Sequence, residues 1–123
     1  MTPWSQDDLR RIGASDDFHI SPYRPDRTTV NTPTWIWSVV VDDDVFVRAY
    51  NGTASRWYRA AKAQGAGHVR AAGLEKAVVF EPVDDAGNDR IDDAYRAKYA
   101  GSPYLAPMIS DRARSATVRI TLR

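Results

Sequence analysis

Small polar and basic residues fill the segment 51–56, which reads NGTASR and follows a predicted strand. Ser55 stands where a helix is expected to begin, and the first amides of a helix have no partners within it. Such amides, together with hydroxyl and guanidinium groups, favour the binding of an anion, phosphate above all. The candidate phosphate ligands are Asn51, Thr53, Ser55 and Arg56, with Arg48 or Arg27 adding charge. The alternative is that Ser55 only caps the helix, and that Arg48 and Arg56 are solvated.

Aromatic residues lie on both sides of this segment. Trp35 and Trp37 precede it, and Trp57 follows it. They have the size and shape to wall a flat apolar slot for a planar ring system, with Tyr50 and Tyr58 nearby. Packing in the core or between subunits is the alternative for each of them. The apolar residues of a later predicted loop are also typical of a pocket or an interface; they are Tyr104, Leu105, Pro107 and Met108.

Other chemistries have less support in the sequence. The chain has no cysteine, and its two histidines lack ligand spacing, so we predict no metal site. No G-x-S-x-G motif is present. Paired aspartates fall at expected helix starts and turns, where capping and solvation explain them. His19, on the polar face of a predicted strand, is the remaining acid–base candidate, although a surface histidine would look the same.

Length and composition predict one globular domain spanning residues 1–123. The 17 basic and 16 acidic residues leave a formal charge of +1, which gives no support to binding of nucleic acid or of an anionic membrane. We find no secretory h-region and no apolar run long enough to cross a membrane. A soluble cytoplasmic protein is the expectation.

Hydrophobic periodicity predicts an α+β protein. Strands are expected at 17–21, 34–41, 45–50, 68–72, 77–83 and 116–122, and helices at 5–13, 55–64 and 88–100, with a helical turn at 110–113. Both faces of the strand 34–41 are apolar, so both are expected to be covered. Hairpin connections favour an antiparallel barrel with helices outside it.

Several segments resemble a small uncharacterised bacterial family that carries only a domain-of-unknown-function label. They read TPTWIW, VRAYNG, SRWYRAA, FEPVDD and DDAYRAKYAGSPYLAPM, and the resemblance covers nearly the whole chain. More distantly, the strand–turn–strand–loop pattern before Trp57-Tyr58 is similar to the FMN-binding split β-barrel superfamily. That superfamily includes pyridoxamine-phosphate oxidase-like proteins and deazaflavin-dependent nitroreductases. The distant resemblance implies a six-stranded antiparallel split β-barrel with flanking helices, assembled as a homodimer.

The superfamily resemblance also implies a cofactor, FMN or a deazaflavin coenzyme, in a groove between barrel and helices. Arg27, six residues before Pro33, matches a basic residue of the deazaflavin group, and Asn51-Gly52 matches its glycine loop. The usual Asn-Pro step after the tryptophan helix is replaced by residues 64–67, QGAG, and no clear strand Arg–Lys pair is present. We therefore expect a flavin- or deazaflavin-binding oxidoreductase acting on a small organic substrate.

Two alternatives remain open at this point. A barrel without a cofactor could bind a small apolar ligand in the aromatic slot. A cofactor-free enzyme could instead use that slot for proton transfer by His19 or by a carboxylate with a raised pKa.

Overall fold

A computed structural model describes residues 4–83 and 88–123 of the chain. The elements are α1 (Gln6–Gly13), β1 (Phe18–Pro22), β2 (Thr34–Trp35), β3 (Ser38–Val41), β4 (Asp44–Arg48), η1 (Gly52–Ala54), α2 (Arg56–Gln64), β5 (Ala66–Ala71), β6 (Leu74–Pro82), α3 (Asn88–Lys98), α4 (Leu105–Met108), α5 (Asp111–Arg114) and β7 (Thr117–Leu122). Asp84 and Asp85 of the FEPVDD segment lie outside the described residues.

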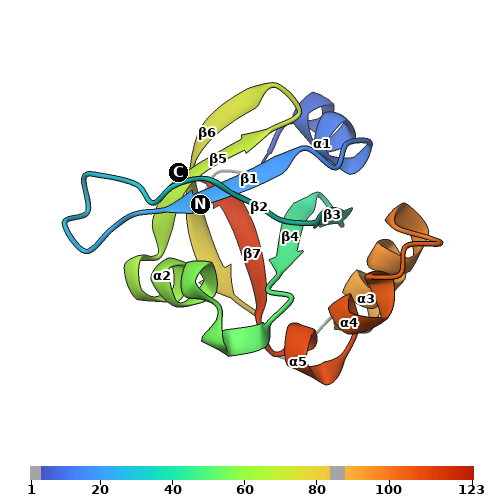
Figure 1. The fold of residues 1–123 in the computed structure, drawn as a ribbon. Helices are drawn as coiled ribbons and strands as arrows, with labels where there is room; N and C mark the ends of the chain where they lie inside the picture. Colours follow the sequence, from blue (N-terminus) through green and yellow to red (C-terminus); the bar gives the residue numbers. More distant parts are fainter. Residues whose placement is uncertain (1–3, 84–87) are drawn as a thin grey trace.

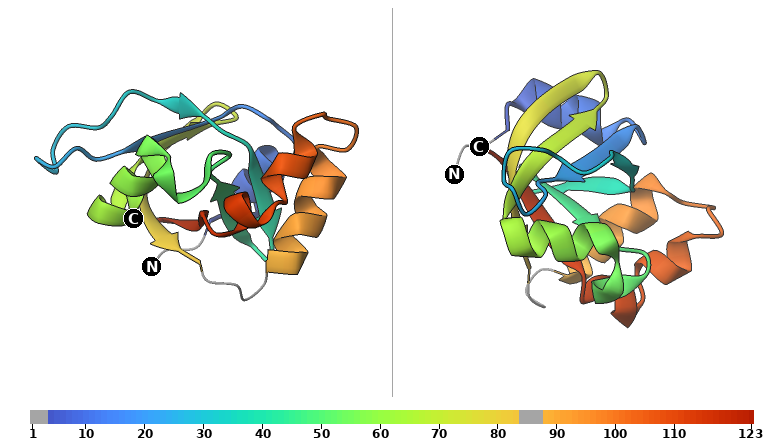
Figure 2. Two further views of the ribbon diagram at one scale, coloured as in Figure 1. Left: turned by 60° about the horizontal axis from the view of Figure 1, so that its bottom comes forward. Right: turned by 60° about the vertical axis from the view of Figure 1, so that its left-hand side comes forward.

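One curled antiparallel sheet forms the body of the fold (Figure 1). Its strand order is β2-β1-β5-β6-β7-β4-β3, and every neighbouring pair is antiparallel. Helix α2 packs on β1, β5 and β6, whereas α1 and α3 pack on β3. The long connection between β1 and β2 projects from the side opposite to α3 (Figure 2). The fold is therefore an α+β half-barrel with flanking helices.

The described residues form seven strands, so the expectation of six is wrong. The predicted strand 34–41 is interrupted at Ile36 and Trp37. Ile36 turns into the core, and the ring of Trp37 stacks on Tyr99 at the end of α3. These two contacts bury apolar side chains that a continuous strand would place elsewhere.

The interruption explains why the sheet curls. β2 and β3 are consecutive in the chain, yet they lie at opposite ends of the strand order. Only two residues join them, and three Cα–Cα steps of 3.8 Å span at most about 11 Å. The two edges of the sheet must therefore approach each other at this crossing.

The strand β3 is covered on both faces, as predicted. Val39 packs with Ile91, Tyr95 and Met108 in a cluster beneath α3. Val40 packs against the larger core, which lies between the sheet, α1 and α2. A helical layer thus lies outside the sheet at this edge.

Arg48 fastens that helical layer to the sheet. Its side chain is 1% exposed and forms a salt bridge with Asp92 of α3. The Nε donates to Thr117 Oγ1 (3.0 Å), and the terminal nitrogens donate to Met108 O (3.1 Å), Asn88 O (3.2 Å) and Asn88 Oδ1 (2.9 Å). These bonds and the one to Asp92 use all five donors of the guanidinium. A single side chain thus joins β4 to α3, α4 and β7.

We expect Asp92→Asn to lower the free energy of unfolding by about 3–5 kcal/mol, because Arg48 would keep a buried charge without its counter-charge. Urea unfolding measures the change. The matched control is Asp93→Asn on the same helix, since Asp93 pairs with Arg96 at the surface. That variant should lose at most about 1 kcal/mol. Equal losses for the two variants would contradict the role of Arg48.

Candidate functional site

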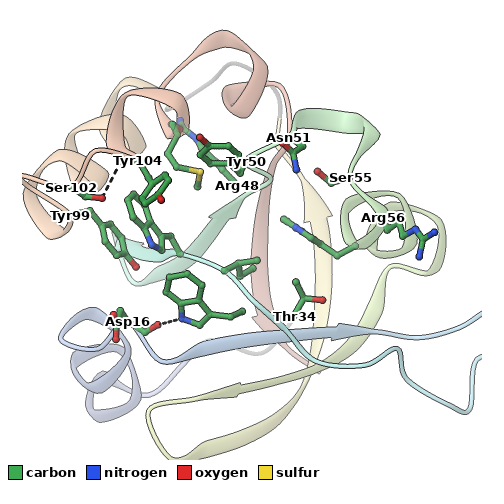
Figure 3. A pocket seen from close by; sticks show the side chains of 15 residues that line it. Asp16, Thr34, Arg48, Tyr50, Asn51, Ser55, Arg56, Tyr99, Ser102 and Tyr104 are labelled. Atoms are coloured by element: carbon green, nitrogen blue, oxygen red, sulfur yellow. Dashed lines mark hydrogen bonds between the residues drawn. The ribbon is translucent and has the colours of Figure 1, made fainter.

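A cleft of about 920 Å³ opens between the crossing segment (residues 36 and 37, between β2 and β3), the start of α2 and the chain that follows α3 (Figure 3). Its volume is in the range of small-molecule sites, roughly 300–1,000 Å³. Seven of the nine predicted cofactor ligands line it: Trp35, Trp37, Arg48, Asn51, Ser55, Arg56 and Trp57. The structure thus brings most of these residues together, and their binding role remains a prediction.

One wall of the cleft is flat and aromatic. The rings of Trp37 and Tyr99 are 3.9 Å apart between centroids and inclined by only 2°. Tyr95 extends the stack, with its centroid 5.9 Å from that of Tyr99. The Tyr99 hydroxyl is bound to both main-chain groups of Ser38, accepting from the N–H (3.1 Å) and donating to the C=O (3.2 Å). These bonds hold the wall rigid.

The most exposed large apolar side chains of the described residues all line this cleft. Trp35 is 52% exposed, Tyr50 39% and Tyr104 60%. Tyr50 and Tyr104 meet edge to face with centroids 6.3 Å apart. Exposed aromatic surface gathered in one hollow indicates a ligand or partner site, because isolated exposed residues would be scattered over the surface.

The opposite end of the cleft is polar and lies at the start of α2 (Figure 3). Ser55 is the residue before the helix, but its side chain makes no capping hydrogen bond. The side chain of Asn51, which precedes η1, makes none either. Arg56, the first residue of α2, is exposed, and its side chain extends away from Ser55 and Asn51 (Figure 3). A hydroxyl and an amide are therefore available to an anion here, and rotation of the exposed Arg56 side chain would bring a guanidinium to it.

Arg48 lines the cleft, but its positive charge is neutralised within the protein by Asp92. Its guanidinium is paired with Asp92 and its donors are all used within the protein. Of the two arginines that line the cleft, Arg56 is therefore the one left to supply positive charge to a ligand. The alternative that Arg48 is a solvated surface residue is wrong, because its side chain is buried.

Three candidate residues lie outside the cleft lining. Arg27 is in the β1–β2 connection, in a left-handed conformation (φ 61°). Thr53 is exposed on η1. His19 lies on β1 with its Nδ1 3.3 Å from the Asp17 carboxylate. Proton transfer by His19 within the cleft has no geometric support.

Sequence reasoning missed several lining residues, among them Asp16, Thr34, Ser102 and Tyr99. Tyr99 belongs to the apolar stripe of α3, and its spacing indicates packing only. Nothing in the spacing shows that the end of α3 lies opposite Trp37. Tyr104 and Met108, which we singled out as apolar loop residues, do line the cleft.

Comparison with known proteins identifies the family. A family model described as "Uncharacterized protein conserved in bacteria (DUF2255)" matches residues 8–120. The chain belongs to this family. No curated protein matches the chain.

A solved structure resembles this DUF2255 protein in fold. It is the conserved hypothetical protein Rv2991 from Mycobacterium tuberculosis, with a TM-score of 0.65 and 14% sequence identity. The similarity covers 98% of this chain and 80% of that one. Within the described residues, no helix of the DUF2255 protein is long and apolar enough to cross a membrane.

Burial shifts the pKa values of two adjacent residues, Lys98 and Tyr99, at the end of α3. It raises the pKa of Tyr99 to about 12, because the phenolate would lose its hydration. Burial also lowers the pKa of Lys98 to about 8, opposed by the negative charge of Asp16. The Lys98 ammonium donates to Ser38 O (2.7 Å) and Ile12 O (3.0 Å), which ties α3 to β3 and α1.

The raised pKa of Tyr99 predicts how the stability of the DUF2255 protein depends on pH. The folded state keeps the Tyr99 proton to higher pH than the unfolded chain, whose tyrosine has the model value of 10.0. The stabilisation is therefore complete below pH 10 and is lost as pH rises through about 12. In urea unfolding across this window, Tyr99→Phe should show a shallower loss than the unmodified protein. Tyr104→Phe, which changes an exposed tyrosine, should leave the slope unchanged; equal slopes in all three proteins would contradict the assignment.

Proposed function

We propose that the cleft binds FMN or a deazaflavin coenzyme, and that the protein uses it to reduce or oxidise a small organic substrate. One observation carries the proposal: a flat aromatic wall and an uncommitted polar helix start belong to the same cleft. A flavin-type cofactor has the matching parts, a planar ring and a phosphate. The sequence resemblance to the split β-barrel superfamily supports the same class.

The lining residues fit such a cofactor. Trp35, Trp37 and Trp57 would wall the ring, and Ser55, Asn51 and Arg56 would hold the phosphate. The hydroxyl of Ser55 suits this role because it does not cap α2. The cofactor supplies the redox chemistry. The protein contributes orientation and charge, so no protein acid or base is required.

The same proposal includes the finer features of the resemblance. The closely approaching sheet edges support a split β-barrel. The exposed Trp35 and Tyr104, which line the cleft, suit a homodimer interface as well as a ligand. The proposal also places the protein in the cytoplasm, where a reduced coenzyme would be available to it.

Calorimetric titration with FMN, and separately with the deazaflavin coenzyme, tests the proposal. We expect saturable binding of one of them with a Kd on the order of micromolar. Arg56→Ala should weaken it more than tenfold, about 1.4 kcal/mol or more, because a charge-assisted bond to phosphate is lost. Arg59→Ala is the matched control, since Arg59 is exposed on the same helix and does not line the cleft.

Two outcomes would contradict parts of this proposal. If Arg56→Ala binds FMN as well as the unmodified protein, the phosphate does not lie at the start of α2. If neither cofactor binds while an apolar dye does, the cleft belongs to a cofactor-free protein for small apolar ligands. Riboflavin lacks the phosphate, so it should bind the Arg56→Ala and Arg59→Ala variants with equal affinity.

A further inference from the structure

A third arginine lies close to the polar end of the cleft. Arg112 belongs to the short helix α5, which packs on η1 (Figure 1). Its guanidinium carbon lies 5.5 Å from the centre of the Tyr50 ring. Tyr50 lines the cleft, and so does Asn51, the next residue in the chain. The guanidinium of Arg112 is therefore beside the rim of the cleft, although Arg112 is not one of the lining residues.

Gly52 determines where the side chain of Arg112 runs. A Cβ atom at residue 52 would lie 2.7 Å from Arg112 Cγ and 3.2 Å from the Arg112 main-chain oxygen. These distances are shorter than van der Waals contact, so any larger residue would push α5 away. Gly52 also has a φ of 77°, which other residues rarely adopt. With glycine here, the aliphatic stem of Arg112 lies directly against η1, and the guanidinium lies over the Tyr50 ring.

The charge of Arg112 has no partner in the part of the chain that the structure describes. No carboxylate there forms a salt bridge with it, and none of its five N–H donors makes a hydrogen bond there. Asp111 precedes it, but adjacent side chains on a helix do not face each other. Arg48 is the opposite case, because Asp92 neutralises its charge. The contact with Tyr50 orients the guanidinium of Arg112 and leaves its N–H groups open to an anion.

The segment η1 brings this guanidinium together with the uncommitted polar groups of the cleft. It contacts both α2, which begins with Arg56, and α5, which carries Arg112. Asn51 and Ser55 stand at its two ends, and neither side chain makes a capping bond. Arg56 must rotate to reach an anion there, and holding it costs side-chain entropy. Arg112 is already restricted by its two contacts, so less entropy is lost when it binds.

We propose that Arg112 binds the anionic group of the ligand, together with Asn51 and Ser55, and that it makes the cleft prefer planar ligands that carry such a group. This inference rests on the proposed function for the use of the cleft, and it adds a residue that decides between anionic and neutral ligands. A hydrogen bond from a guanidinium to an oxyanion is roughly twice as strong as one between neutral groups. A neutral ring in the same place gains nothing from this bond.

Two pairs of probes that differ by an anionic group test the inference. FMN and riboflavin differ by a phosphate, whereas 8-anilinonaphthalene-1-sulfonate and N-phenyl-1-naphthylamine differ by a sulfonate. Fluorescence titration gives the ratio of the two affinities in each pair. For Arg112→Gln, we expect the preference for the anionic member to fall about tenfold, because one charge-assisted bond is lost. The neutral member should bind as it does to the unmodified protein.

The matched control is Arg123→Gln. Arg123 is also an exposed arginine over a tyrosine ring, 5.7 Å from the centre of Tyr23. The variant loses the same charge and the same kind of ring contact, but neither Arg123 nor Tyr23 lines the cleft. It should therefore keep the preference of the unmodified protein.

The outcomes separate this inference from the proposed cofactor. If FMN binds and Arg112→Gln keeps the full preference over riboflavin, the role of Arg112 is overturned while the cofactor assignment stands. If neither flavin binds but the preference for the sulfonate dye depends on Arg112, the anion site stands and the flavin assignment fails. Equal losses in Arg112→Gln and Arg123→Gln would reveal a general effect of net charge and would also overturn the inference.

Discussion

Burying the guanidinium of Arg48 removes a charge from water, and the fold must offset that cost with a counter-charge and hydrogen bonds. Asp92, Asn88, Met108 and Thr117 supply them. These partners come from α3, α4 and β7, so they fasten the helical layer to the sheet. The cleft depends on this constraint, because one of its walls is formed by the end of α3 and the chain that follows it.

The crossing segment supplies the second constraint. Ile36 and Trp37 carry the chain from one edge of the sheet to the other, and Trp37 stacks on Tyr99 as it does so. The stack therefore closes the half-barrel and forms the flat wall of the cleft at the same time. The aromatic surface that closes the fold is also the surface that would receive a ring.

Local patterns in the sequence predict most elements, because alternating apolar residues and helix caps act over a few residues. They also place Trp35, Trp37 and Trp57 around one site. The break at Ile36 could not be predicted, since a run of apolar residues is equally compatible with one continuous strand. The buried state of Arg48 was missed for a similar reason: its partners Asp92 and Thr117 are distant in sequence. Asp16 has no distinctive neighbours, and only the fold brings it to the cleft.

The most direct measurement is a crystal structure of the protein grown with FMN or the deazaflavin coenzyme. We expect electron density in the cleft, with the ring against Trp37 and the phosphate at Ser55 and Arg56. Density for the cofactor elsewhere on the protein would contradict it. So would a ring in the cleft whose phosphate lies at the end opposite to Ser55 and Arg56.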